Sequence, residues 1–166
     1  TDAPRGFFLK GKVRAWQGKS LLLANQVNGE ESEARLSAAG AVRTLIDLQK
    51  DTPTEMTEVI ADFLTYRKQE ASVTFTGGVR LTQGTRTLTC DELVADLDEA
   101  QQMRSMRGTG KVRLRDTLAG RSIEARTATY DVGAESIELR GEPVTMIDET
   151  GATLKGKRAL YDLKSS

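Results

Sequence analysis

Histidine is absent from this chain, and cysteine occurs only once, at Cys90. Without histidine the chain lacks the usual general base near neutral pH and the commonest metal ligand. A single cysteine excludes a disulfide within the chain. The sequence also has no Gly-x-Ser-x-Gly motif and no carboxylate pair on a recognisable frame. We therefore predict that the protein is not an enzyme and that it holds no metal and no cofactor.

Net charge is also missing, because 24 basic and 24 acidic residues cancel. Nucleic-acid binding normally needs a clustered basic excess, so we expect no nucleic-acid partner. No run of about 18 apolar residues occurs, and the sequence therefore contains no expected transmembrane helix. The 166 residues suit one domain with a sizeable core, which we predict to span residues 1–166.

One pattern occurs twice between residues 73 and 131 and then recurs along most of the chain. In it, apolar or small residues alternate with Thr, Lys and Arg, which is strand periodicity. No sustained helical stripe accompanies it. We recognise five degenerate copies, each a pair of strands, anchored on Val13, Val42, Val79, Val112 and Val144.

The second copy is interrupted. Residues 47–58 are polar and contain Pro53, so we interpret them as a loop or insertion. If a helical turn occurs anywhere, residues 30–39 and 91–104 are the expected places.

The second strand of each copy carries a break in its alternation. The apolar spacing runs two and then three, and a step of three switches the face to which the pattern points. We therefore predict a bend or bulge at the same place in every copy. Small residues precede each break, and a matching column of glycines crosses the first strands. They are Ala24, Ala61, Cys90, Ala125 and Gly156, and Gly11, Gly40, Gly77, Gly110 and Gly141.

These patterns predict an all-β, repeat-built stack of about ten to twelve strands, folded along a crease into two facing sheets. The Val, Leu, Ile, Phe and Met side chains would lie between them. Such a stack has open ends with unpaired backbone groups, which can accept another strand. We therefore expect end-to-end association with a similar protein or with a second copy.

Four segments, at residues 75–84, 108–116, 122–131 and 139–148, resemble the OstA-like domain of the lipopolysaccharide-transport family. That family comprises LptA, LptC and the N-terminal domain of LptD. The resemblance implies a V-shaped β-jellyroll, also described as a β-taco, of antiparallel strands. It implies a hydrophobic groove for the acyl chains of lipopolysaccharide (lipid A), and end-to-end strand addition to other jellyroll domains of this kind, or to itself.

The same resemblance implies a periplasmic location, as part of a bridge to the outer membrane, with a signal peptide or membrane anchor missing from this sequence. It leaves open which of the three roles the chain has. The expected groove residues are the inward-facing apolar side chains of the repeats. They are Leu9, Val13, Leu22, Val42, Val59, Phe75, Val79, Leu81, Leu88, Met106, Val112, Leu114, Ile123, Ile137, Leu139, Val144, Met146 and Leu154.

A lipid groove and an ordinary sandwich core use the same residues. The alternative hypothesis is therefore a structural or interaction repeat of the cell envelope that binds no lipid. An open groove would favour the carrier, and an interior filled by its own side chains would favour the scaffold.

Three further features have open interpretations. The basic alternations at residues 10–14 and 111–115 would face away from the apolar side, as a solvated face or as contacts to lipid phosphate. The acidic residues within 91–99 lack the spacing of a calcium-binding loop. Trp16 falls on the polar side of its strand, where it would mark a contact surface or cover a sheet edge.

Overall fold

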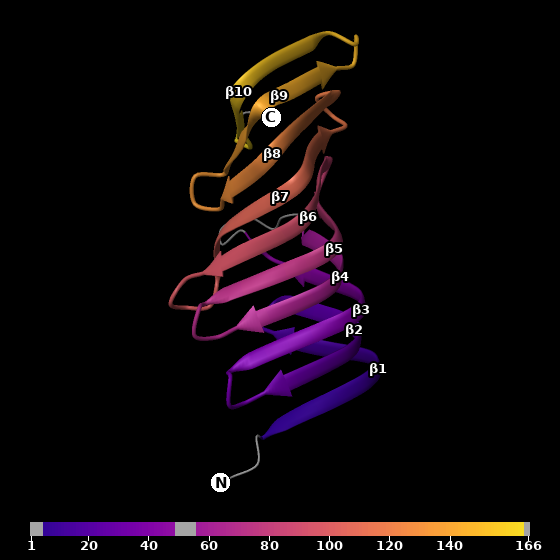
Figure 1. Cartoon of the computed structure of the whole chain (residues 1–166), viewed down its shortest axis with the longest axis vertical. Helices are drawn as coiled ribbons and strands as arrows, with labels where there is room; N and C mark the ends of the chain where they lie inside the picture. The colour runs from indigo at the N-terminus through magenta and orange to yellow at the C-terminus, as the bar shows by residue number, and fades with distance from the viewer. Residues whose placement is uncertain (1–4, 49–55, 165–166) are drawn as a thin grey trace.

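The computed structural model describes residues 5–48 and 56–164, which form ten β-strands and no helix. Figure 1 shows them stacked in chain order along the long axis of the molecule. The strands are β1 (Gly6–Gln17), β2 (Ser20–Glu30), β3 (Arg35–Ile46), β4 (Thr57–Arg67), β5 (Ser72–Gln83), β6 (Arg86–Leu97), β7 (Met103–Asp116), β8 (Arg121–Asp131), β9 (Ser136–Asp148) and β10 (Thr153–Asp162).

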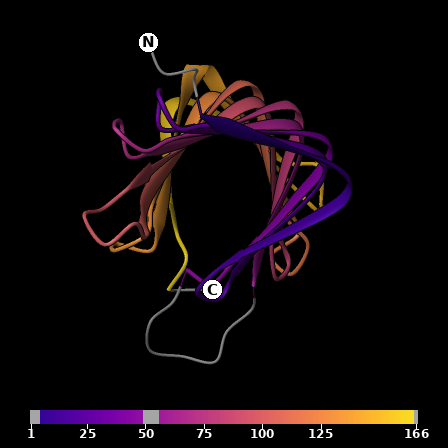
Figure 2. The ribbon, with the colours of Figure 1, turned by 90° about the horizontal axis from the view of Figure 1, so that it is seen from below.

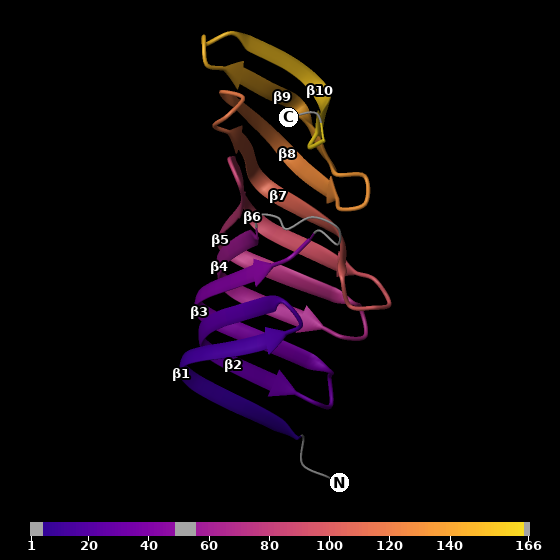
Figure 3. The same ribbon diagram turned by 180° about the vertical axis from the view of Figure 1, so that it is seen from behind.

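All ten strands belong to one antiparallel sheet in which each strand pairs with its neighbours in the sequence. β1 and β10 are its edges, and they lie at opposite ends of the stack, as the view from behind also shows (Figure 3). The predicted all-β fold with open ends is confirmed. The two facing layers are the two arms of a single bent sheet, which curve around a common interior when viewed along the stack (Figure 2).

A break in register at the crease bends the sheet in every pair of strands, and the pairing of β6 with β7 has a second break between Asp96 and Leu97. The pairing of β5 with β6 is interrupted between Thr76 and Val79, and that of β7 with β8 between Thr109 and Val112. All nine pairings contain such an irregularity, and it falls beside the small residues that the sequence places before the change of face. The prediction of a bulge in each copy is therefore confirmed.

The crease depends on glycine where a neighbouring side chain covers the bulge. Gly77 has a φ of +84°, and a Cβ built there would lie 2.5 Å from an Asp62 carboxylate oxygen. Gly110, with a φ of +79°, is covered by Asp91 in the same way. Both the left-handed backbone and the lack of space exclude larger residues at these two positions.

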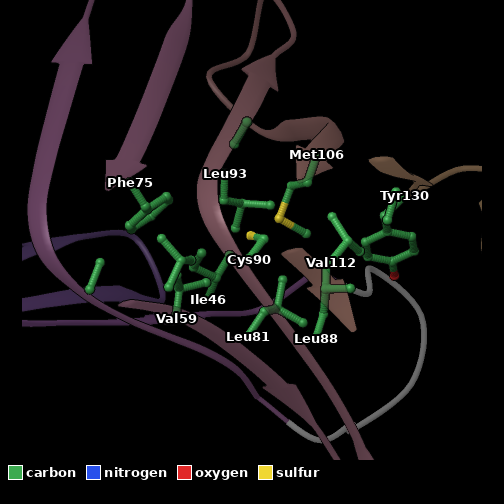
Figure 4. Close-up of a cluster of buried hydrophobic side chains, with 14 of the residues drawn as sticks. Ile46, Val59, Phe75, Leu81, Leu88, Cys90, Leu93, Met106, Val112 and Tyr130 are labelled. Atoms are coloured by element: carbon green, nitrogen blue, oxygen red, sulfur yellow. The ribbon is translucent and has the colours of Figure 1, made fainter. Parts of the chain in front are cut away.

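The core lies between the two arms, where side chains from the inner faces contact one another. Figure 4 shows Phe75, Leu93, Met106 and Val112 pointing toward a shared centre. Each of these is at most 1% exposed. Alternation along the strands puts the other side of the sheet in solvent.

The expectation of a helical turn within residues 30–39 or 91–104 is wrong. Residues 30–39 contain the end of β2, a short turn and the start of β3, and residues 91–104 contain most of β6, a turn and the start of β7. Period-two alternation resumes in both segments and decides their structure. Within the predicted loop at 47–58, Thr57 and Glu58 belong to β4, whereas 49–55 lie outside the described residues. No helix with the length and hydropathy of a membrane span occurs in the part of the chain that the structure describes.

Candidate functional site

Apolar residues form continuous rows along the inner face of the sheet, from one end of the stack to the other. Residues paired across neighbouring strands point to the same side, so a row can be followed through the register. One such row, in the second arm, comprises Leu22, Thr44, Val59, Leu81, Leu88, Leu114, Ile123, Met146 and Leu154. Apart from the buried Thr44, this row is apolar, so the interior forms an apolar track that runs through the stack.

The opposite arm supplies a matching row that begins at Leu9 on β1 and ends at Ala159 on β10. Between them lie Val27, Ala38, Leu64, Phe75, Leu93, Gly108, Ala128 and Leu139. The registers place every residue of the predicted groove on this inner side. Their burial differs with position along the stack, however.

The predicted residues at the two ends of the stack are open to solvent. Leu9 on β1 is 50% exposed and Leu154 on β10 is 64% exposed. Val13, Leu22 and Met146, near the same ends, are half-buried. No strand stacks beyond β1 or β10 within the described residues to cover these side chains, so the apolar interior is accessible at both ends.

The middle of the track is filled by the protein's own side chains. Val59, Phe75 and Leu139 are each 0% exposed. A cavity of about 20 Å³ remains between Leu81, Leu88, Met106, Leu114, Ile137 and the polar residues Gln83, Arg86 and Tyr130. That volume holds about one water molecule. In this conformation the apolar interior is exposed at the ends of the stack and filled by side chains at its centre.

A polar cluster that the sequence analysis missed lies beside this cavity and joins the two arms. Asp116, at the end of β7, is 2% exposed. It accepts hydrogen bonds from Tyr161 Oη on β10 and from Thr85 Oγ1 at 3.2 Å. Arg86 Nε lies 3.4 Å from the same carboxylate, and its guanidinium carbon is 6.0 Å from the centre of the Tyr161 ring.

The cluster controls the ionisation of its members. Burial by itself would raise the pKa of Asp116, but hydrogen bonds from Tyr161, from the backbone amides of Ala119 and Leu118 and from Thr85 outweigh it. The pKa of Asp116 is therefore lowered, and its carboxylate is ionised at neutral pH. Burial and the Asp116 carboxylate raise the pKa of Tyr161, which keeps its hydroxyl protonated and able to donate.

The preceding repeat joins the arms in a similar way. Tyr130 occupies the same row as Tyr161, because both face Ile137 across β9. Burial raises the pKa of Tyr130, and a hydrogen bond with Gln83 opposes that shift. Gln83 in turn donates to Thr57 Oγ1 at 3.1 Å. The recurring Tyr-Asp dipeptide at 130–131 and 161–162 is the sequence signal that marks these tyrosines.

The remaining candidates have ordinary surroundings. Among the described residues, no three His, Cys, Asp or Glu side chains gather as a metal site would require. The basic residues at 10–14 and 111–115 are exposed on the outer face, and Arg113 pairs there with Glu124. Cys90 is buried in the crease. Burial, and then the charge of Asp91, raise the pKa of its thiol to about 11.

Both the sequence of this chain and its bent sheet of ten strands can be compared with known proteins. Residues 58–166 match the family model described as the LptA/(LptD N-terminal domain) LPS transport protein. The chain belongs to this family. Its match covers more than half of the sequence and includes the strands that carry the polar cluster.

The fold agrees with that assignment. The solved structures similar to this chain include LptH from Pseudomonas aeruginosa, described as the LptA-homologous periplasmic component of the lipopolysaccharide transport device. The TM-score is 0.55 at 22% sequence identity, over 64% of this chain and 75% of LptH. A search of curated proteins finds no match. Membership of the family supports a role in lipopolysaccharide transport.

Proposed function

We propose that this protein is a periplasmic carrier that takes the acyl chains of lipopolysaccharide into the apolar track between its two arms. The observation that carries the proposal is the continuity of that track from β1 to β10, with apolar side chains uncovered at both ends. Burying acyl chains against these side chains would stabilise the complex by about 25 cal/mol per Å² of apolar surface removed from water.

Loading would begin at an end of the stack, where Leu9 or Leu154 is accessible, and would proceed inward as the arms separate. The centre is filled by side chains in this conformation, and the cavity beside the polar cluster measures about 20 Å³. Lipid entry therefore requires opening along the line of the polar cluster, where hydrogen bonds rather than backbone pairing join the arms.

The protein would also assemble with other domains through the two edges of its sheet. β1 and β10 each pair on one side only, so each presents an edge to which a further strand can be added. Another jellyroll domain of the lipopolysaccharide-transport family, or a second copy of this chain, would extend the stack and continue its inner track. Repeated addition would form part of a bridge toward the outer membrane. The proposal needs no catalytic step, metal or cofactor.

A scaffold that assembles through its edges without binding lipid is the second candidate. The filled centre favours it, since Phe75, Leu93 and Leu139 already occupy the space between the arms. The carrier and the scaffold differ in one property that can be measured on the purified chain, its affinity for lipopolysaccharide.

Neighbouring residues on β10 provide a matched pair for that test. Leu154 points to the inner side and Lys155 to the outer side, and both are exposed, so replacing either disturbs little packing. We expect the wild-type chain to bind purified lipopolysaccharide, Leu154→Gln to weaken binding severalfold, and Lys155→Gln to weaken it less. No binding by a folded wild-type chain would leave the scaffold as the function.

A further inference from the structure

The outer face of the second arm changes character along the stack. One row on this face contains Trp16, Leu21, Leu45, Glu58, Thr82, Thr87, Arg115, Ser122, Ile147 and Thr153. The row beside it contains Arg14, Leu23, Arg43, Ile60, Arg80, Thr89, Arg113, Glu124, Thr145 and Lys155. Apolar side chains dominate at β1–β4, whereas Thr, Ser, Arg, Lys and Glu dominate at β5–β10.

The residues at the first end form one contiguous apolar area, which we call the outer patch. It consists of Trp16, Leu21, Leu23 and Leu45, which adjoin one another through the register of β1–β3, and of Ile60 on β4, which pairs with Arg43 and lies diagonally from Leu45. Trp16 is 69% exposed and Ile60 is 39% exposed, and the leucines are half-buried. This apolar area faces solvent on the convex side of the sheet and does not contribute to the packing between the arms. Exposed apolar areas of this kind indicate a contact surface.

Positive charge borders the outer patch on β1. Lys10, Lys12 and Arg14 are exposed and form no ion pair within the part of the chain that the structure describes. Of the acidic residues near the outer patch, Glu58 pairs with Arg43 and Asp47 lies 3.3 Å from Lys19 Nζ. Asp62, two residues beyond Ile60, is exposed and forms no ion pair among the described residues, but the three cations on β1 outnumber it. The local surface therefore carries a net positive charge, although the whole chain is neutral.

We propose that the outer patch docks on the surface of a bilayer that contains anionic phospholipids. Tryptophan is favoured at the boundary between headgroups and acyl chains, where its ring is apolar and its N–H is hydrated. Lysine and arginine beside it reach the anionic headgroups while their methylenes stay against apolar surface. The combination of an aromatic and aliphatic centre with unpaired cations matches that chemistry.

Docking through the outer patch leaves the proposed carrier function undisturbed. The outer patch is on the convex side of the sheet, so the inner track and the β1 backbone edge both remain accessible. The membrane would hold the β1 end of the stack, while β10 at the opposite end stays free to reach a partner. Docking is also independent of whether lipopolysaccharide enters the interior.

Trp16 reports on this contact directly, because it is the only tryptophan in the chain. We would titrate the full chain with vesicles of phosphatidylcholine alone and with vesicles that also contain phosphatidylglycerol. We expect a blue shift of the emission with the anionic vesicles, and its reversal in high salt. No shift with either vesicle would overturn the proposal, as would an equal shift with the neutral ones.

Paired variants separate the two components of the contact. Lys10→Gln combined with Arg14→Gln should weaken binding to anionic vesicles by more than about tenfold, since each cation near such a surface contributes about a fivefold change in affinity. Leu23→Ser should also weaken it. Ile147→Ser and Lys155→Gln, on the same two rows at the far end, should leave it unchanged. A blue shift that depends on protein concentration without vesicles would assign the outer patch to self-association and contradict membrane docking.

Discussion

Tyr161 on the last strand donates a hydrogen bond to the carboxylate of Asp116 at the end of β7, joining two arms of the sheet that share no backbone pairing at that point. The two residues are 45 positions apart in the sequence. Together with Arg86 they form a polar contact across an otherwise apolar interior. In the proposed mechanism, this contact must break when the arms separate.

Removing the Tyr161 hydroxyl should destabilise the fold. Tyr161→Phe leaves the buried Asp116 carboxylate with one donor fewer, and a hydrogen bond to a charged group contributes about 2 kcal/mol. Tyr66→Phe is the matched control, because Tyr66 donates to the neutral Gln101 side chain at 2.6 Å. We expect a loss of about 1 kcal/mol there. Urea unfolding measures both, and equal losses would contradict the special position of Asp116.

Acid should weaken the same contact. Because the pKa of Asp116 is lowered in the folded protein, the carboxylate stabilises the fold above its ordinary pKa near 4, and this contribution is lost as the pH falls through the lowered folded-state pKa. The free energy of unfolding should therefore decrease more steeply below about pH 4 in the wild type than in Asp116→Asn. Urea midpoints between neutral and acidic pH test this, and parallel curves would show that Asp116 contributes no pH dependence.

Of the two adjacent glycines in the crease, Gly77 and Gly78, we expect only Gly78 to tolerate substitution without a large loss of stability. Gly77→Ala places a Cβ against Asp62 in a left-handed backbone, and we expect a loss of about 3 kcal/mol. Gly78 also has a positive φ, but a Cβ built there would meet nothing within 4 Å. Lys12, Ala41 and Lys111 adopt the same conformation at the equivalent positions. Gly78→Ala should therefore cost about 1 kcal/mol. Thermal unfolding of the two variants measures both losses. A larger loss of stability in Gly78→Ala than in Gly77→Ala would contradict this prediction.

The thiol of Cys90 should react slowly in the folded protein. Its pKa of about 11 leaves little thiolate at pH 8, and the residue is only 6% exposed. We expect labelling by a disulfide reagent to be slower by about 100-fold or more than in denaturant, where the pKa returns to its ordinary value. Rapid labelling of the native chain would show that the interior opens readily without lipid.

Local patterns in the sequence were sufficient to predict the fold and the bends. The step of three after Ala61 and after Cys90 falls where the pairings of β4 with β5 and of β6 with β7 are interrupted. Alternation fixes which face a side chain takes, and the predicted groove residues accordingly share one face. Burial could not be predicted in the same way. Leu9 and Leu154 have the pattern of core residues but lie on the two edge strands of the sheet.

The polar cluster was beyond prediction from periodicity because it depends on how far the arms twist. Tyr161 reaches a carboxylate three strands earlier in the stack, and no local spacing encodes that offset. Asp116 ends an alternating strand, and the alternation gives no information about a partner in the opposite arm. The apolar outer patch was similarly divided among four strands, and only their register brings Trp16 next to Leu21.

Site-specific photo-crosslinking in intact cells shows whether lipid occupies the interior of the sheet. Met146 and Ile147 are adjacent on β9, are both apolar, and face the inner and outer sides of the sheet respectively. They also lie far from the outer patch. We expect lipopolysaccharide adducts with the probe at Met146 and none at Ile147. Adducts at neither position in a folded protein, or at Ile147 alone, would contradict the carrier function.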